Sequence, residues 1–150
     1  MLTAFGVLHH VPNVTVVIHE FSRVLKPGGY FLFREPIVSM GDWRRSRFGL
    51  TKNERGIPLP ILRNLLKDAG FEVVREGVCV FPPLTRLCKF ICPDVYNSRL
   101  ITLIDAVLCR LFACNVNYHP RVWWQKIRPT SVFYVLRKLP VKTVIGNCAK

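Results

Sequence analysis

Two adjacent histidines and a glutamate are the residues of this sequence best suited to acid–base chemistry. His9 and His10 directly follow a short apolar run, and Glu35 follows a second one. An imidazole titrates near neutral pH and can accept a proton from a hydroxyl nucleophile, which makes His10 a candidate base. Glu35 could orient a hydroxyl or amine of a substrate. The alternative is structural, with the histidines shaping a loop and Glu35 pairing with Arg34.

A second group of candidates consists of aromatic and imidazole side chains that could line a pocket for a small molecule. Its members are Trp43, Tyr118, His119, Trp123 and Trp124. Such side chains supply apolar walls for a ligand, but they serve as often in the core of a subdomain. We expect Trp43, Tyr118 and His119 to contact substrate. Cys88 and Cys92 could share a helix face, but no further ligands accompany them, so no metal site is expected.

Buried strands and an amphipathic helix must position the two histidines. The apolar run at residues 2–8 is typical of a buried parallel strand. Asn13 can cap the helix that follows, in which apolar residues recur with helical spacing over residues 14–25. After a proline and two glycines, residues 30–33 predict a second buried strand. Residues 37–57 are polar and basic, and we expect a long loop of the kind that often carries function.

The later segments predict another helix, two more strands and a helical insertion. A helix is expected over residues 60–69, and strands over residues 71–81 and 131–136. Between these strands, residues 98–114 predict a helix with one apolar stripe and a polar side that includes Asp105. The stripe consists of Leu100, Leu103, Ile104, Val107, Leu108 and Leu111. We expect the stripe to pack against the sheet and Asp105 to point away from it.

The composition describes a folded and strongly basic protein. Half of the 150 residues are apolar, and 22 Lys and Arg residues outnumber 9 Asp and Glu residues. The positive surface attracts phosphates, acidic lipids and anionic substrates, but the scattered charge predicts no specific nucleic-acid binding. No apolar run reaches the length of about 18 residues that spans a bilayer. Together with six cysteines that suit reduced, buried thiols, these features predict a cytoplasmic protein.

The motifs of residues 2–80, taken in order, resemble a known enzyme family. A strand, the turn Leu-His-His-Val-Pro and a capped helix are followed by E-x-x-R-V-L-K-P-G-G at residues 20–29 and Asp-Ala-Gly-Phe at residues 68–71. This order resembles the second half of class I S-adenosylmethionine-dependent methyltransferases of the type 11 kind. The resemblance implies an α/β fold, the C-terminal half of a Rossmann-like doubly wound sheet. Its strands would take the order 4-5-7-6, with an antiparallel last strand and a helical insertion.

The resemblance also implies a domain organisation and roles for individual residues. The organisation comprises a partial methyltransferase domain at residues 1–80 and 131–138, a helical insertion on the acceptor side at residues 81–130, and a basic tail at residues 139–150. Leu8 and His9 would lie near S-adenosylmethionine, whereas His10 would face the acceptor. The reaction would be methyl transfer to a small molecule, with oxygen as the expected acceptor atom.

The sequence departs from this family at the cofactor. The family holds S-adenosylmethionine with a glycine-rich turn after its first strand and an acidic residue after its second. None of the nine glycines forms a G-x-G after an apolar strand. We therefore expect the C-terminal portion of a longer methyltransferase, inactive alone and without S-adenosylmethionine binding of its own. The exposed edge of its first strand would pair with a missing amino-terminal half or with a second copy.

The alternative function is non-catalytic. A basic module could bind an anionic membrane surface or a partner chain through the amphipathic helix over residues 98–114. Salt-sensitive sedimentation with acidic liposomes would support this alternative, whereas methylation of a small molecule would support the enzyme.

Overall fold

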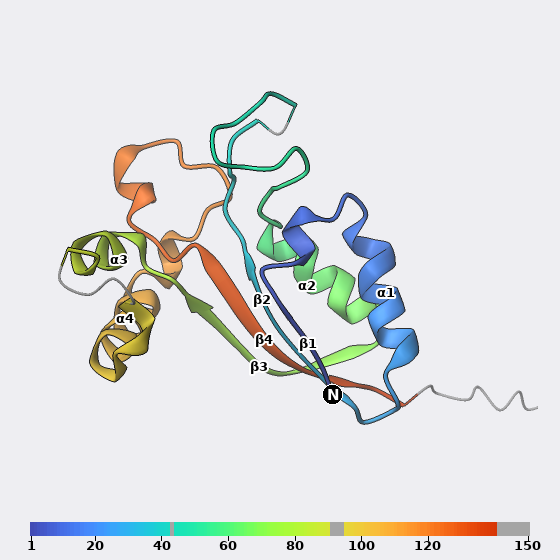
Figure 1. Cartoon of the computed structure of the whole chain (residues 1–150). Helices are drawn as coiled ribbons and strands as arrows, with labels where there is room; N and C mark the ends of the chain where they lie inside the picture. Colours follow the sequence, from blue (N-terminus) through green and yellow to red (C-terminus); the bar gives the residue numbers. More distant parts are fainter. Residues whose placement is uncertain (43, 91–94, 141–150) are drawn as a thin grey trace, which may run out of the picture.

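One mixed sheet organises the molecule, for which the computed structural model describes residues 1–42, 44–90 and 95–140. Within these residues, four strands take the order β1-β2-β4-β3 (Figure 1). β1 (Leu2–Phe5) and β2 (Tyr30–Pro36) run parallel, whereas β4 (Ser131–Lys138) is antiparallel to β2 and to β3 (Phe71–Cys79). This arrangement confirms the predicted α/β class, the strand order and the antiparallel last strand.

Two helices cover one face of this sheet. α1 (Val14–Val24) begins after Asn13, whose side-chain Oδ1 accepts a hydrogen bond from the Val16 amide at 3.3 Å. α2 (Leu59–Asp68) carries a proline in its first turn and is followed by Gly70, which has a φ of +77°. A left-handed residue at this position suits glycine and ends the helix. Both helices lie on the same side of the sheet in Figure 1, as right-handed connections require.

Aromatic side chains from neighbouring strands form the centre of the core beneath these helices. Phe31 stacks on Phe33 with ring centroids 4.9 Å apart, and Phe33 stacks on Tyr134 at 5.1 Å. Ile18 of α1 and Leu62 of α2 belong to the same buried cluster. Burial of each such side chain contributes about 1.5–3 kcal/mol. The core therefore holds the carboxyl ends of β1 and β2 side by side, where the candidate site lies.

The first strand ends earlier than the sequence predicts. β1 stops at Phe5, and Leu8–His10 form a 3-10 helix (η1) instead of the end of a strand. The break occurs at Gly6, whose φ of +66° turns the chain out of the sheet. Conversely, β2 continues beyond its predicted end to Pro36, so Glu35 lies within a strand. The apolar run at residues 2–8 therefore does not give the length of the strand.

One edge of β1 has no neighbour within the part of the chain that the structure describes. β1 pairs with β2 alone. Near this edge, Phe5 is 60% exposed and Val7 is 48% exposed. Unpaired backbone groups beside apolar side chains favour pairing with another strand. The exposed edge is therefore present as predicted, while the identity of its partner stays a prediction.

The segment between β3 and β4 forms a group of short helices beside β3 (Figure 1). Its elements are α3 (Pro82–Cys88), η2 (Val95–Asn97), α4 (Arg99–Leu111), η3 (Ala113–Asn115) and η4 (Trp123–Lys126). α4 contacts β3, and the Ser98 hydroxyl caps it by accepting a hydrogen bond from the Ile101 amide at 3.4 Å. No helix among the described residues has both the length and the apolar character needed to cross a membrane.

α4 packs with the face opposite to the predicted one. Asp105 and Cys109 are buried. The most exposed members of the predicted stripe are Leu100, Leu103 and Leu111, at 66%, 63% and 67%. The cause lies at Val80, which has a φ of +65° and, together with Phe81, presents its amide to Asp105 at distances of 3.1 and 2.8 Å. Backbone donors beneath α4 need an acceptor, so the carboxylate takes the inner face.

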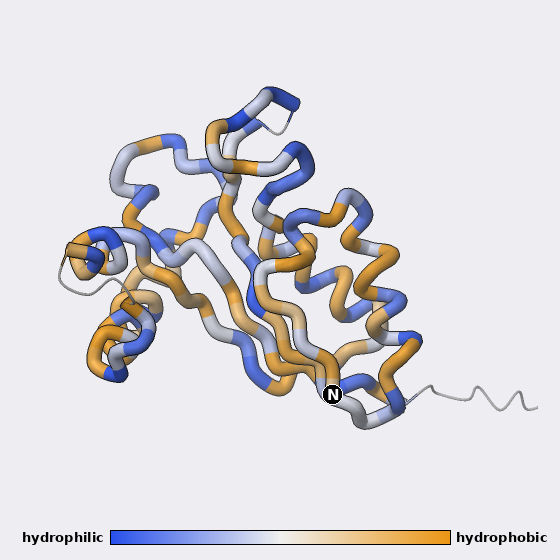
Figure 2. Tube along the Cα trace, in the orientation of Figure 1, coloured by the Kyte–Doolittle hydropathy of each residue, from blue (hydrophilic) through white to orange (hydrophobic). Residues whose placement is uncertain are grey.

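The outward apolar face of α4 leaves hydrophobic residues at the surface far from the main core. Figure 2 shows hydrophobic residues along the strands and again along α4. Arg99 and Arg110 are also exposed on this helix. The predicted packing of the apolar stripe against the sheet is therefore wrong.

Candidate functional site

A buried glutamate joins the carboxyl ends of β1 and β2. Glu35 is 0% exposed. Its Oε1 accepts the amides of Val7 and Leu8 at 2.8 and 2.9 Å, and its Oε2 lies 3.2 Å from the His9 amide and 2.7 Å from His9 Nδ1. These bonds satisfy backbone donors that the break after β1 leaves outside the sheet. Glu35 therefore fixes residues 7–10, which we call the histidine turn, to the sheet.

This clamp decides which of the predicted residues are accessible. Both oxygens of Glu35 bond within the protein, so the geometry gives this carboxylate a positioning role, and its contact with a substrate stays a prediction. Leu8 is 0% exposed within the core and His9 is 8% exposed. The cofactor contacts of these two residues also stay predictions. The apolar surface that is exposed at this end of β1 belongs to Phe5 and Val7.

His10 extends from the histidine turn toward the loop of residues 37–57. Its Nδ1 lies 3.2 Å from Thr51 Oγ1 and 3.7 Å from Glu54 Oε2. Glu54 in turn accepts hydrogen bonds from the Thr51 amide at 3.0 Å and from the Thr51 hydroxyl at 3.3 Å. A Thr51 hydroxyl that donates to Glu54 accepts from the Nδ1–H of His10, which leaves Nε2 as the basic nitrogen. The exposed His10 side chain is thus oriented to take up a proton.

The charge of Glu54 supports this arrangement. The hydrogen bond from the Thr51 amide, helped by the neighbouring imidazoles and the Thr51 hydroxyl, holds the pKa of Glu54 below its usual range against the opposing effect of desolvation. Glu54 is therefore ionised at neutral pH. A carboxylate 3.7 Å from His10 Nδ1 stabilises the imidazolium that forms when His10 accepts a proton.

His9, His10 and Glu54 also form a group of donors of the kind that binds metals. One ligand atom from each lies within 4.8 Å of the others. The carboxylate of Glu54 is 3.9 Å from His9 Nε2 and 3.7 Å from His10 Nδ1. Ligands of one tetrahedral zinc ion lie about 3.3–3.5 Å apart. Because the separations are wider and His10 Nδ1 contacts Thr51, the arrangement suits hydrogen bonding better than metal coordination.

The loop of residues 37–57 joins the histidine turn to the helical insertion. It reaches the histidine turn where Arg55 N donates to His9 O at 3.0 Å. It reaches the insertion where Ser39 N donates to Tyr118 O and Tyr118 Oη donates to Gly56 O, both at 2.9 Å. A Cβ at Gly56 would lie 2.0 Å from a backbone oxygen, so this close approach requires glycine. The loop therefore contacts both groups of predicted site residues.

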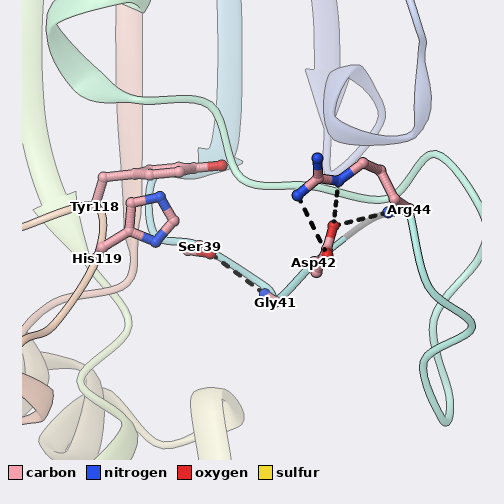
Figure 3. A pocket seen from close by; sticks show the side chains of 6 residues that line it. All are labelled: Ser39, Gly41, Asp42, Arg44, Tyr118 and His119. Carbon is pink, nitrogen blue, oxygen red and sulfur yellow. Dashed lines mark hydrogen bonds and ion pairs between the residues drawn. The ribbon is translucent and has the colours of Figure 1, made fainter.

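A pocket of about 510 Å³ lies between this loop and the insertion (Figure 3). Its lining consists of Ser39, Gly41, Asp42, Arg44, Tyr118 and His119. Figure 3 shows the rings of Tyr118 and His119 on one side and Asp42 and Arg44 on the other, with Arg44 Nε donating to Asp42 Oδ1 at 3.0 Å. This bond lowers the pKa of Asp42. Aromatic walls beside paired charges suit a small polar ligand.

The structure places the predicted aromatic residues in different surroundings. Tyr118 and His119 line the pocket, and burial raises the pKa of Tyr118. Trp43 lies outside the described residues. Trp123 and Trp124 are 71% and 53% exposed and do not belong to the pocket lining. Substrate contact through Tyr118 and His119 stays a prediction.

No motif in the sequence marks Thr51, Glu54, Ser39 or Arg44 as a site residue. All four belong to the polar loop that was expected to be functional as a whole. Which of its side chains meet His10 or Tyr118 depends on the path of the loop, and no local spacing signals it. The one local signal was Gly56, because a glycine in a loop can mark a place where two backbone segments approach closely.

Thiols of the described residues are free and mostly shielded. The free cysteines are Cys79, Cys88, Cys109 and Cys114, whereas Cys92 and Cys148 lie outside the described residues. Burial raises the pKa of Cys79 to about 11 and, helped by Asp105, that of Cys109 to about 12. Both are therefore protonated thiols at neutral pH and weak nucleophiles.

Known proteins share both sequence and fold with this chain. Residues 1–76 match the profile of the family described as a methyltransferase domain. A hybrid PKS-NRPS synthetase from an Acremonium species is 38% identical over 69 residues, which are 46% of this chain. The matched segment is only 2% of the length of that synthetase.

Three solved structures illustrate the similarity of fold. A candidate methyltransferase from Bacillus halodurans has a TM-score of 0.52 at 19% identity, over 93% of this chain and 70% of that chain. A candidate S-adenosylmethionine-dependent methyltransferase from Listeria monocytogenes has a TM-score of 0.55 at 11% identity, over 93% and 61% of the two chains. A phosphoethanolamine N-methyltransferase from Haemonchus contortus, solved with phosphomonomethylethanolamine and S-adenosylhomocysteine, has a TM-score of 0.50 at 16% identity, over 92% and 33%.

The family match covers β1, α1, β2 and α2, the elements that carry the histidine turn and the Glu35 clamp. The solved structures extend the likeness of fold over nearly all of this chain. The chain therefore belongs to the methyltransferase domain family and has the fold of class I S-adenosylmethionine-dependent methyltransferases.

Proposed function

We propose that this chain forms the acceptor side of an S-adenosylmethionine-dependent methyltransferase that methylates an oxygen atom of a small molecule. The observation that carries this proposal is the oriented imidazole of His10, held by Thr51 and Glu54 at the carboxyl ends of β1 and β2. Ligands of doubly wound sheets bind beyond these strand ends. A base at this place suits a hydroxyl acceptor, which must lose a proton on methylation.

S-adenosylmethionine, when bound, supplies an electrophilic methyl group on a sulfonium. The described residues fit one wall of its site, because Phe5 and Val7 offer exposed apolar surface beside the free edge of β1. Glu35, the carboxylate at this end of the sheet, is buried and fully bonded, so it is not free to hold ribose hydroxyls. We therefore propose that cofactor binding and activity require further strands of the sheet besides the four described.

The chain's own residues would remove and hold one proton. His10 Nε2 accepts the proton of the acceptor hydroxyl while the oxygen takes up the methyl group, and the imidazole becomes an imidazolium. Glu54 stabilises this cation through its negative charge. Glu35 keeps the histidine turn on the sheet, so the base keeps a fixed position from which to reach the acceptor hydroxyl. Tyr118 and His119 would hold the acceptor from the insertion side.

A chimera tests the proposal. Fusing the amino-terminal sheet half of the Bacillus halodurans domain to this chain should give methyl transfer from labelled S-adenosylmethionine to hydroxyl compounds. His10→Asn in the chimera should lower kcat by about 10²–10⁴, the usual contribution of a positioned base. His19→Asn, on the exposed side of α1, is the matched control and should leave kcat unchanged.

Three results would contradict parts of this proposal. Transfer of the label to nitrogen in mixed acceptors would exclude oxygen as the acceptor atom. A His10→Asn chimera with full kcat would remove the base. Micromolar binding of S-adenosylmethionine to the isolated chain, measured by calorimetry, would show that no further sheet portion is needed.

The outer face of α4 favours a second candidate function. Its exposed leucines lie beside Arg99 and Arg110, a combination that suits the surface of an anionic membrane. Sedimentation with phosphatidylserine vesicles should then remove the chain from solution at low salt, and Leu103→Gln with Val107→Gln should abolish this binding. Equal sedimentation of the variant and the unchanged chain would refute a role for α4.

A further inference from the structure

A second hollow shares Arg44 with the pocket in Figure 3. It has a volume of about 550 Å³ and is formed by the loop of residues 44–52. Ser46, Leu50 and Thr51 line it together with four cationic residues, namely Arg44, Arg45, Arg47 and Lys52. We call this hollow the basic hollow. Its size suits a small-molecule group.

The positive charge of the basic hollow is only partly neutralised within the protein. Asp42 lies 3.0 Å from Arg44 Nε and 3.8 Å from Arg45 Nε. The Arg47 guanidinium bonds to two backbone carbonyl oxygens, both at 3.1 Å, and to no carboxylate of the described residues. Lys52 has no hydrogen bond or ion pair within the described ranges. Two carboxylates, Asp42 and the Glu54 that bonds to Thr51, therefore lie near four cations, and a concave surface with this excess of positive charge attracts an anion.

Thr51 connects the basic hollow to the candidate base. This residue lines the hollow, its carbonyl oxygen accepts a bond from Arg47, and its hydroxyl lies 3.2 Å from His10 Nδ1. Thr51 alone would thus separate a ligand held by the cations from His10. The same loop contains Arg44, which lines the pocket of Tyr118 and His119.

We propose that the basic hollow binds the anionic group of the acceptor, so that the substrate is a hydroxyl compound carrying a carboxylate or a phosphate. The hydroxyl of this substrate rests on the proposed function of His10. Its anionic group is inferred independently, from the cations of the basic hollow. Arginine forks bind both kinds of oxyanion through charge-assisted hydrogen bonds. A neutral acceptor would leave Arg47 and Lys52 without a carboxylate partner among the described residues.

Binding measurements on the intact chain test this inference without any methyl donor. The probes are inorganic phosphate, p-hydroxybenzoate and its neutral amide, titrated at 150 mM salt and followed through backbone amide shifts. We expect saturable binding of phosphate or p-hydroxybenzoate, with shifts confined to His10 and residues 44–52, and no binding of the amide. The tighter of the two anions identifies the group that the acceptor carries.

Paired variants separate a specific site from general attraction by the basic surface. Arg45→Gln with Lys52→Gln removes two exposed charges and should weaken anion binding about tenfold or more. Arg23→Gln with Lys67→Gln lowers the net charge equally on α1 and α2, and should leave binding unchanged. Equal losses in both pairs, binding of the neutral amide, or no saturable binding would overturn the inference. Failure of methyl transfer in the chimera would leave these results intact, so the two proposals fail separately.

Discussion

Glu35 and Asp105 are two buried carboxylates that perform the same task in different regions of the molecule. Glu35 is 0% exposed in β2 and accepts the amides of the histidine turn. Asp105 is 4% exposed in α4 and accepts the amides of Val80 and Phe81, which follow β3. Each carboxylate serves a place where the chain leaves a strand through a residue with positive φ.

The difference between the two lies in what they hold. Glu35 also binds an imidazole, so the structure that it fixes carries candidate chemistry. Asp105 instead binds the helical insertion to the sheet, and its other neighbour is the inert thiol of Cys109 at 3.6 Å. A buried carboxylate in this fold therefore indicates a strand exit that needs acceptors, and its partners decide whether the place is functional.

Removal of the charge at Glu35 should have the largest effect. Glu35→Gln puts an amide group against backbone donors and leaves buried N–H groups without acceptors. We expect the free energy of unfolding to fall by about 3–5 kcal/mol, measured by urea titration with circular dichroism. Glu20→Gln, which changes a surface pair with Arg23, should shift it by less than about 0.5 kcal/mol. Equal effects of the two variants would show that the clamp is not needed for stability.

The corresponding change in the insertion should cost less. Val80 N and Phe81 N bond to different oxygens of Asp105, so Asp105→Asn leaves one of these two amides without its acceptor, but it removes no imidazole partner. The expected loss is about 1–3 kcal/mol in the same urea titration. Asp68→Asn at the exposed end of α2 serves as the matched control and should remain within about 0.5 kcal/mol. A loss as large as that of Glu35→Gln would show that the two carboxylates contribute equally to stability.

The reactivity of the Cys109 thiol measures how well α4 shields its inner face around Asp105. With a pKa of about 12, Cys109 is a protonated thiol at pH 8, and its thiolate population rises only as the pH approaches that value. The exposed Cys114 should react with N-ethylmaleimide at least about tenfold faster, as measured by peptide mass spectrometry. Comparable rates at pH 8 would mean that α4 does not shield its inner face.

The smallest effect is expected on the outer face of α4. Leu103→Ala should change the free energy of unfolding by less than about 0.5 kcal/mol, because this side chain is 63% exposed. Leu62→Ala in α2, where the side chain is fully buried, should cost about 2–5 kcal/mol. Similar losses for both leucines would restore the packing that the apolar stripe of α4 predicted.

Local signals in the sequence predicted α1 and the start of β2 well, because a capping asparagine, an apolar stripe and a proline-glycine turn act within a few residues. The strand order came from resemblance, since no periodicity specifies which strands are neighbours. The orientation of α4 was missed because the demand for an acceptor arises at Val80, 25 residues away from Asp105. Thr51 and Glu54 were missed for the same reason, as their place beside His10 depends on how a loop returns to the sheet.

The position of β4 between β2 and β3 has a consequence for biosynthesis. β4 follows β2 and β3 along the chain, yet it pairs with both neighbours, from Pro36↔Ser131 to Phe71↔Lys138. Its final residue also ties back to α1, where Lys138 Nζ donates to Leu25 O at 2.7 Å. The nascent chain can pair β1 with β2, but the middle of the sheet stays open until β4 has been synthesised. Assembly of this sheet therefore depends on pairings that are distant in sequence, which favours slow folding.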